Sequence, residues 1–262
     1  MKVGIIGCGF IGGEIANFVD KNKNFVLIGV NDIDKHKANI LIKKLHDKPK
    51  FMDLNELIKK SDLIIESAGK SAVKLILENK NLDKKNKKLL LMSTIGLINN
   101  LNFLSGIKNC EILLPSGAIA GLDAIKSVSG KIKSLTLTTT KPVKGLENAP
   151  YIIKNNINLR KIKNKKIIFQ GNLIDAIKGF PQNINVAATL FFASKFDNLK
   201  VKIVADPYTK FNSHEIEAEG YFGKIKTLTI NLPSKNPRTS YLAVLSAIYT
   251  IKNLKSNIKI GN

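Results

Sequence analysis

Apolar residues along the first hundred positions form short runs that are separated by segments with helical spacing. The runs predict buried strands at residues 2–6, 25–30, 62–68, 89–93 and 111–114. The segments between them predict helices at residues 12–20, 33–46, 53–58 and 71–79. Strands that alternate with helices in this way imply right-handed crossovers and a parallel sheet.

The pattern changes after about Gly130, where alternation of apolar and polar residues replaces the continuous runs. Strands are expected at residues 134–140, 165–170, 200–205, 214–220 and 226–231, with helices at 121–127 and 186–194. Few long helices separate these strands, so a mostly antiparallel sheet with helices on one face is expected. A helix-start signal at 236–240 precedes a last helix, 239–252, which we expect to return to the first domain.

A glycine loop follows the first predicted strand directly. Gly7, Gly9 and Gly12 have the G-x-G-x-x-G spacing, with Phe10 and Ile11 between the last two. In this motif the glycines permit a tight turn, the approach of a pyrophosphate and close packing of helix and strand, in that order. Asp32 ends the second predicted strand, twenty positions after Gly12, where an acid binds the adenosine ribose. The pattern therefore predicts a site for NAD or NADP.

These elements predict an α/β protein with two domains. The first is a Rossmann-type doubly wound parallel sheet that binds a dinucleotide, over residues 1–114, to which 236–262 returns as a C-terminal helix. The second is an α+β domain with a mostly antiparallel sheet, over residues 115–235, which we expect to hold the substrate and the dimer contacts.

The composition and the net charge limit the classes of partner that this chain is expected to bind. The chain has 262 residues and a formal net charge of +22, but its lysines are spread along the sequence and tryptophan is absent. A solvated lysine surface is therefore favoured over a nucleic-acid footprint. No apolar run is long enough to span a bilayer and no signal peptide is recognised. Cys8 and Cys110 lack paired spacing, which favours the reducing cytoplasm, and no metal-ligand cluster is present.

His214 differs from the other two histidines, which we place on the surface in and after a lysine-rich helix. Strict alternation through residues 214–219 puts Glu215, Glu217 and Glu219 on one face and His214 on the other. Three acids expose their face to water, so His214 is expected on a covered face, at the floor of a cleft. An imidazole there, with a pKa near neutrality, suits general acid–base catalysis.

Two further segments suit a flat ring and its carboxamide. Small residues at 114–124 join a strand to a helix and permit close approach to the backbone, at the carboxyl edge where ligands bind. Residues 180–188 place Asn183 and Asn185 just before a helix. Capping explains one of these asparagines, and the amide of the other is free to hold a carboxamide.

The chain resembles the L-aspartate dehydrogenase family over nearly its whole length. The segments that carry the resemblance are 7–12, 116–124, 140–142, 180–188, 206–207, 212–216 and 236–240. The resemblance implies a homodimer that oxidises L-aspartate with NAD or NADP, releases oxaloacetate and ammonia, and can supply iminoaspartate to pyridine nucleotide biosynthesis. It also implies that His214 is the active-site histidine, and that Ala118 or Ala120, with Asn183 or Asn185, contacts the nicotinamide.

The layout suggests a reaction in which aspartate lies between the domains and loses hydride from Cα. His214 would deprotonate the amine or activate water, and Ser116, Lys141 and Asn212 are candidates to hold the substrate carboxylates. Two alternatives stay open. One is another two-domain dehydrogenase or reductase, similar to dihydrodipicolinate reductase or homoserine dehydrogenase. The other is a non-enzymatic protein that binds a nucleotide or nucleic acid.

Overall fold

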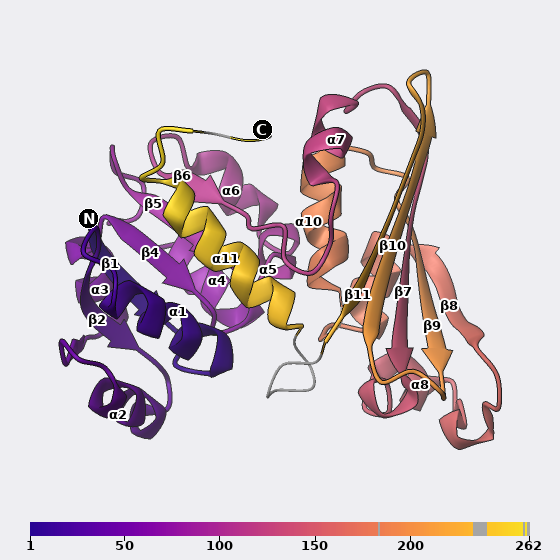
Figure 1. Cartoon of the computed structure of the whole chain (residues 1–262), viewed down its shortest axis with the longest axis horizontal. Helices are drawn as coiled ribbons and strands as arrows, with labels where there is room; N and C mark the ends of the chain where they lie inside the picture. The colour runs from indigo at the N-terminus through magenta and orange to yellow at the C-terminus, as the bar shows by residue number, and fades with distance from the viewer. Residues whose placement is uncertain (183, 233–239, 259, 261–262) are drawn as a thin grey trace. The chain divides into compact units, whose positions relative to one another are not determined.

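The computed structural model describes residues 1–182, 184–232, 240–258 and 260. The chain divides into two compact units (Figure 1). Unit 1 comprises Met1–Pro115 and Val244–Asn257, and unit 2 comprises Ser116–Ala243 and Ile258–Asn262. The sequence places the first boundary at residue 114 and the return of the chain at 236, which lies outside the described residues.

Unit 1 is built on a parallel sheet of six strands in the order β3-β2-β1-β4-β5-β6. This is the doubly wound order that the sequence predicts. The strands are β1 (Lys2–Ile6), β2 (Val26–Asn31), β3 (Lys50–Phe51), β4 (Leu63–Glu66), β5 (Lys88–Leu91) and β6 (Glu111–Leu113). The helices are α1 (Phe10–Asp20), α2 (Lys35–Lys44), α3 (Leu54–Lys60), α4 (Lys70–Leu77), α5 (Ile95–Ile98), α6 (Leu101–Gly106) and the C-terminal α11 (Tyr241–Asn253).

Local sequence explains where these helices begin and what they cover. Asp34 and Asp53 cap α2 and α3 by accepting hydrogen bonds from backbone N–H groups of the first turn. The apolar side of α1 packs on the sheet in one core cluster with Ala247 and Ile251 of α11. The C-terminal helix thus contributes to the core of unit 1.

Unit 2 has a mixed sheet of five strands in the order β11-β10-β7-β9-β8. The strands are β7 (Ile132–Pro142), β8 (Lys166–Asn172), β9 (Lys200–Asp206), β10 (Asn212–Gly220) and β11 (Gly223–Asn231). Only the β7–β9 pair is parallel, so the expectation of a mostly antiparallel sheet is confirmed. The helices are α7 (Leu122–Ser127), α8 (Pro150–Lys154), α9 (Leu173–Gly179) and α10 (Asn185–Ser194), with 3-10 turns η1 (Val143–Gly145) and η2 (Leu159–Lys161).

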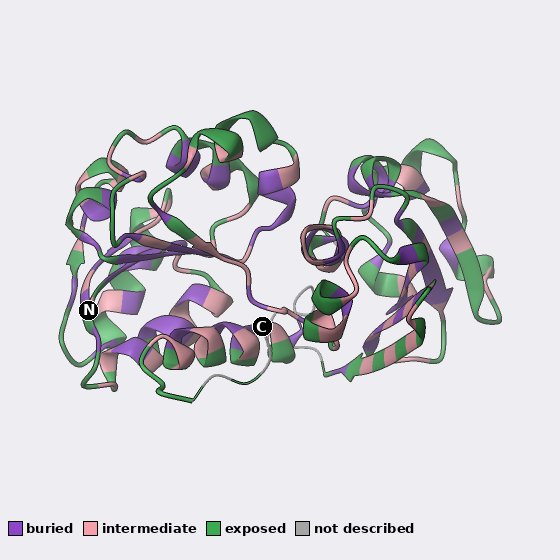
Figure 2. Ribbon diagram, turned by 90° about the horizontal axis from the view of Figure 1, so that it is seen from above, coloured by how far each residue is buried: buried purple, intermediate pink, exposed green. Residues whose placement is uncertain are grey.

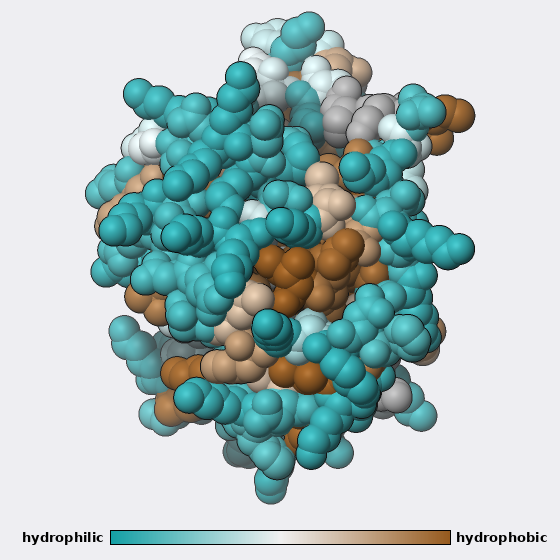
Figure 3. All heavy atoms as spheres, turned by 90° about the vertical axis from the view of Figure 1, so that its left-hand side faces the viewer, coloured by the Kyte–Doolittle hydropathy of each residue, from teal (hydrophilic) through white to brown (hydrophobic). Residues whose placement is uncertain are grey.

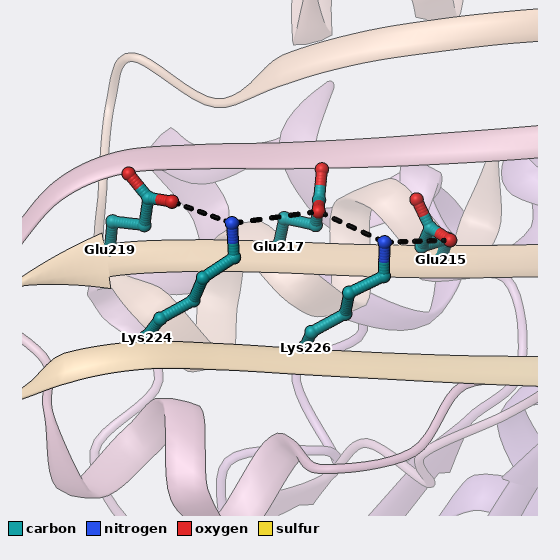
Figure 4. A network of polar contacts seen from close by, with 5 residues as sticks. All are labelled: Glu215, Glu217, Glu219, Lys224 and Lys226. Carbon is teal, nitrogen blue, oxygen red and sulfur yellow. Dashed lines mark hydrogen bonds and ion pairs between the residues drawn. The ribbon is translucent and has the colours of Figure 1, made fainter.

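The two faces of this sheet differ in polarity, as the alternation in β10 predicts. Ile216 and Ala218 are fully buried, whereas Glu215 and Glu217 are half-buried and Glu219 is exposed. Burial changes from residue to residue along the strands of this sheet (Figure 2). The three glutamates form a ladder of ion pairs with Lys224 and Lys226 of β11 (Figure 4). These contacts are exposed, so the ladder favours the register of the β10–β11 hairpin more than it adds stability.

Several short helices are not expected from the sequence. Helices α5, α6, α8 and α9 have four to seven residues each, which is too short to show helical spacing. Asn172 caps α9 through the N–H of Asp175, a signal that does not stand out between two apolar runs. These elements connect strands and do not change the predicted fold class.

The surface matches the dispersed charge. Among the described lysines only Lys87 and Lys141 are buried. The face shown in Figure 3 is covered mainly by hydrophilic side chains, with an apolar area near its middle. Within the described part of the chain, no helix has both the length and the apolar character that crossing a membrane requires.

Candidate cofactor and active site

The glycine loop of unit 1 has the geometry that a bound pyrophosphate needs. Gly7 has φ +97°, and a Cβ there would lie 2.6 Å from the backbone N of Ala68. A Cβ on Gly12 would overlap the carbonyl oxygen of Gly7, so helix α1 approaches the loop as closely as its backbone allows. A Cβ on Gly9 meets nothing within 4 Å. Gly7 and Gly12 are thus required by the fold, whereas open space lies over Gly9.

Asp32 follows β2 and turns its carboxylate into the glycine loop. Its Oδ2 accepts from the backbone N of Cys8 at 2.7 Å, and its Oδ1 accepts from the backbone N of Asp34 at 2.8 Å. Burial and this carboxylate raise the pKa of the Cys8 thiol to about 12, which makes Cys8 a small filler of the loop. Phe10 and Ile11 form the first turn of α1 and are half-buried.

Glu66 is a buried acid at the same sheet edge that sequence reasoning missed. Its carboxylate accepts four hydrogen bonds, from the backbone N of Ala68, Gly69 and Ser93 and from the Ser93 hydroxyl, at 2.8–3.0 Å. Burial raises its pKa, and the hydrogen bonds oppose that shift. Glu66 thus ties together the loops after β4 and β5. The hydroxyl of Ser67, the next residue, donates to the Gly7 carbonyl at 2.9 Å and links these loops to the glycine loop. The only feature of the sequence that marks Glu66 is that it is a charged residue at the end of an apolar strand.

In unit 2, His214 lies on the covered face of the sheet and is 4% exposed. It is paired with Thr139 of β7 on one side and with Thr229 of β11 on the other. Its Nδ1 lies 3.0 Å from the hydroxyl oxygen of Thr139. This contact fixes the ring through Nδ1, and Nε2 has no hydrogen-bond partner among the described residues. The buried orientation predicted for His214 is therefore confirmed.

Lys141 lies two residues beyond Thr139 on the same face of β7 and is 5% exposed. Among the described residues, no carboxylate lies within ion-pair distance of its ammonium group. Burial alone lowers the pKa of Lys141 to about 8. Burial, and then the charge of Lys141, lower the pKa of His214 to about 3. The near-neutral pKa expected for His214 is therefore wrong for the ligand-free chain. Burial, which the strand alternation predicts, disfavours the charged ring, and the charge of Lys141 lowers the pKa further.

The loop of small residues is tied to the strand beside His214. The carbonyl of Ala118 accepts from the Thr229 hydroxyl at 2.7 Å and from the Asn231 amide at 3.1 Å. The carbonyl of Ala120 accepts from the hydroxyl of Thr227 at 3.2 Å. Sequence reasoning missed these β11 side chains, because a polar residue that points inward from an edge strand looks like a solvent-facing one. Ala118 is buried and Ala120 is exposed, so the two candidate nicotinamide contacts differ in how accessible they are to a ligand.

The other predicted residues have different positions. Asn212 is buried at the start of β10, on the face that carries His214 and next to Asn231 of β11 in register. Ser116 is half-buried at the start of the small-residue loop. Asn185 is the exposed first residue of α10, and Asn183 lies outside the described residues. Unit 2 thus brings His214, Lys141, Asn212 and the Ala118 loop together, while Asn185 is placed by α10.

Comparison with known proteins assigns the family. The model described as "Aspartate dehydrogenase, C-terminal" matches residues 123–254, and that described as "Homoserine dehydrogenase, NAD binding domain" matches residues 7–100. L-aspartate dehydrogenase of Methanosarcina mazei is 42% identical over 100% of this chain and 99% of its own length. The chain belongs to the L-aspartate dehydrogenase family. L-aspartate dehydrogenase of Methanosarcina acetivorans is 41% identical with the same coverage.

Solved structures agree with this membership. The crystal structure of aspartate dehydrogenase from Thermotoga maritima has a TM-score of 0.75 and 27% identity, and covers 100% of this chain and 99% of that one. A myo-inositol dehydrogenase from Lactobacillus casei has a TM-score of 0.56 at 13% identity, over 86% of this chain and 73% of that one. The second likeness concerns the fold alone. The Rossmann-type fold, the NAD or NADP cofactor and the dehydrogenase class predicted from the sequence are thus confirmed.

Proposed function

We propose that this protein catalyses the NAD- or NADP-dependent oxidative deamination of L-aspartate, with oxaloacetate and ammonia as products. One observation supports the substrate most directly. In a member of this dehydrogenase family, a buried ammonium that has no carboxylate partner in the described part of the chain lies on the same sheet face as a buried imidazole. A buried cation is costly unless it is paired, and a substrate with two carboxylates supplies the missing negative charge.

The residues of unit 1 fit the cofactor. The open space over Gly9 and the N-terminal end of α1 suit the pyrophosphate, and Asp32 suits the ribose hydroxyls. When bound, the nicotinamide ring accepts the hydride that leaves Cα of the amino acid. The chain itself positions the substrate, provides charge and moves protons.

We assign Lys141 to a carboxylate of aspartate, with Asn212 and Ser116 as neutral donors beside it. Lysine binds anions as a point charge, so it needs no fixed two-point geometry to hold a carboxylate. A bound carboxylate also restores the ordinary pKa of Lys141, because an opposite charge favours the ammonium form. The same negative charge raises the pKa of His214, whose ring is neutral before binding.

We assign His214 the role of general base. A neutral ring held through Nδ1 leaves Nε2 to accept a proton, first from the substrate ammonium or later from the water that adds to the imine carbon. Hydride can leave Cα only after the amine is neutral, so the proton transfer from the substrate ammonium precedes oxidation. Replacing His214 by Asn keeps a polar side chain of similar size but removes the basic nitrogen.

The test is reduction of NAD and NADP with L-aspartate, and the reverse reaction with oxaloacetate and ammonia. Assays with homoserine and dihydrodipicolinate test the two alternative enzymes, homoserine dehydrogenase and dihydrodipicolinate reductase. The match to the homoserine dehydrogenase model covers residues 7–100 only. We expect turnover with aspartate alone. We also expect His214→Asn to lower kcat by about a hundredfold or more, which is the usual contribution of a positioned base. The exposed His36→Asn is the matched control, and equal losses in both variants would contradict the assignment.

We also propose a cytoplasmic homodimer that supplies iminoaspartate to pyridine nucleotide biosynthesis. Cys8 and Cys110 are free thiols, which suits a reducing compartment. Leu228 and Ile230 of the edge strand β11 are 55% and 65% exposed on the face of the Glu–Lys ladder, where a second copy would cover them. Light scattering should give a dimer mass for the native chain and a monomer mass for the Leu228→Glu variant.

A further inference from the structure

Glu66 has no part in the proposed chemistry, although it lies at the carboxyl edge of the parallel sheet. It is fully buried at the last position of β4. Its Oε1 accepts from the backbone N of Ala68 and of Gly69, each at 2.8 Å, and from the Ser93 hydroxyl at 2.9 Å. Its Oε2 accepts from the backbone N of Ser93 at 3.0 Å. One buried side chain thus holds the loop after β4 with one oxygen and the loop after β5 with both.

The position of these two loops in the sheet relates them to one half of the cofactor. A dinucleotide lies across the point where the strand order reverses, which in the order β3-β2-β1-β4-β5-β6 is between β1 and β4. Asp32 follows β2, so the adenosine half belongs over β1, β2 and β3. The nicotinamide half then extends over the ends of β4, β5 and β6, where the loops held by Glu66 lie.

The loop after β4 is open on the side away from Glu66. Gly69 has φ +116°, and a Cβ there would meet nothing within 4 Å among the described residues. Ala68 is exposed, although its backbone N–H points to the buried acid. Backbone that no side chain covers permits close approach of a ligand. The loop therefore offers an open surface that a buried carboxylate fixes from below.

We infer that Glu66 is a positioning residue, which holds in place the loops under the nicotinamide half of the cofactor. Because it is buried, it acts on the ligand through the backbone of residues 68–69 and through Ser93. Loops that are fixed before binding favour affinity, since a loop that becomes ordered on binding costs free energy. A carboxylate suits this task because both of its oxygens accept hydrogen bonds, whereas an amide has a single acceptor oxygen.

The experiment measures the dissociation constants of the reduced cofactor and of ADP by calorimetry, in the absence of aspartate. The reduced cofactor is NADH or NADPH, whichever the native chain binds more tightly. ADP contains the adenosine and both phosphates of the cofactor and lacks its nicotinamide half. The ratio of the two constants therefore reports on the loops after β4 and β5, apart from general damage to unit 1.

Glu66→Gln is the first variant. Glutamine keeps the size of the side chain and one oxygen that can accept from Ala68 and Gly69, but its NH2 group then faces the backbone N–H of Ser93. We expect the reduced cofactor to bind about tenfold more weakly, as one unsatisfied buried donor implies, and the dissociation constant of ADP to stay unchanged.

Ser93→Ala is the second variant, because loss of a buried acid can also prevent folding. It removes the hydroxyl that donates to Oε1 and keeps the backbone N–H that donates to Oε2. We expect the same selective loss of cofactor binding, by about threefold. If Glu66→Gln does not fold, this variant decides the question alone.

Asp83→Asn is the matched control. Oδ1 of Asp83 accepts from the backbone N of Lys108, Asn109 and Cys110 at 2.6–3.0 Å, so this carboxylate also holds a loop. That loop precedes β6, so it lies at the edge of the same sheet opposite the carboxyl ends of the strands. The substitution should leave both dissociation constants unchanged.

Equal weakening of cofactor and ADP binding in Glu66→Gln would overturn the inference, because general damage to unit 1 affects both ligands. Unchanged cofactor binding in both variants would overturn it as well, as would a selective loss in Asp83→Asn or a native chain that binds neither NADH nor NADPH.

The inference rests on the cofactor of the proposed function and not on its substrate. A selective loss of cofactor binding in a protein that does not turn over aspartate would reject the proposed substrate alone. Turnover of aspartate by the native chain, with unchanged cofactor binding in both variants, would reject the role of Glu66 alone.

Discussion

Replacing Lys141 by methionine should make the ligand-free protein more stable while it abolishes binding of the substrate. Methionine has nearly the shape of the lysine stem and no charge. The ammonium of Lys141 is buried in unit 2, and no carboxylate of the residues that the structure describes pairs with it, so the folded state bears the cost of keeping it charged. That cost is absent from the unfolded chain, where water surrounds the ammonium.

The lowered pKa gives the size of the effect. The pKa of Lys141 falls from 10.5 to about 8, and each pKa unit corresponds to about 1.36 kcal/mol, so the charged form costs about 3 kcal/mol. The folded chain holds fewer protons than the unfolded chain between these two pH values. The stability of the native protein should therefore rise as the pH increases from 8 to 10.5, and stability should not rise in this way in Lys141→Met.

Urea denaturation near neutral pH, without substrate or cofactor, is the assay. We expect the free energy of unfolding of unit 2 to increase by about 2–3 kcal/mol, allowing for an imperfect fit of the methionine. The affinity for aspartate, measured in the presence of NADH, should fall by at least about a hundredfold, since a charged hydrogen bond to the substrate is lost. A less stable variant with unchanged pH dependence would refute the reasoning.

Lys87→Met is the matched control for Lys141→Met. Lys87 is the other buried lysine among the described residues, and its ammonium donates to the carbonyls of Ile58, Lys59 and Ser61 at the C-terminal end of α3. Its removal leaves those acceptors without a donor, so this variant should be less stable by about 1–3 kcal/mol. Changes of opposite sign in the free energy of unfolding would distinguish the two lysines. The charge of Lys141 would then serve the substrate, and the charge of Lys87 would stabilise the fold.

Three further predictions concern unit 1. Glu66→Ala should lower the free energy of unfolding by about 3 kcal/mol or more in denaturant, because three backbone N–H groups and the Ser93 hydroxyl lose their acceptor; an unchanged midpoint would contradict this account. Gly9→Ala should keep the native melting temperature but weaken NADH binding at least about tenfold. Gly12→Ala should instead unfold at a lower temperature, because of these two residues it is Gly12 whose added Cβ would meet the backbone. The thiol of Cys8 should react slowly with iodoacetamide at neutral pH in the folded protein, because its raised pKa of about 12 leaves almost no thiolate, and rapid labelling would show that the loop is open.

The sequence was most informative where a pattern repeats or a spacing is fixed. Continuous apolar runs separated by helical segments predicted the parallel sheet of unit 1, and the spacing of Gly7, Gly9 and Gly12 predicted the loop whose geometry the structure confirms. Strict alternation around His214 predicted its burial. Local patterns of this kind reflect the period of a helix or a strand, so they survive without knowledge of the fold.

The sequence was least informative where a residue acts through a partner far away in the chain. Glu66 meets Ser93, and Thr229 and Asn231 meet the carbonyl of Ala118 more than a hundred positions earlier. Nothing in the local pattern marks these residues, because their polar groups are satisfied only after strands from different parts of the chain are paired. The roles assigned to His214 and the nicotinamide contacts stay predictions.

By itself, the sequence determined the two kinds of sheet, the nucleotide loop and the side of β10 on which the imidazole lies, because period and spacing set all three. Only the tertiary structure decided the charge state of that imidazole. The pairing of β7 with β10 puts Lys141 and His214 on one covered face, where burial lowers the pKa of both groups and the charge of Lys141 lowers that of His214 further. A pKa depends on the surroundings of a side chain, and those surroundings exist only once the sheet has formed.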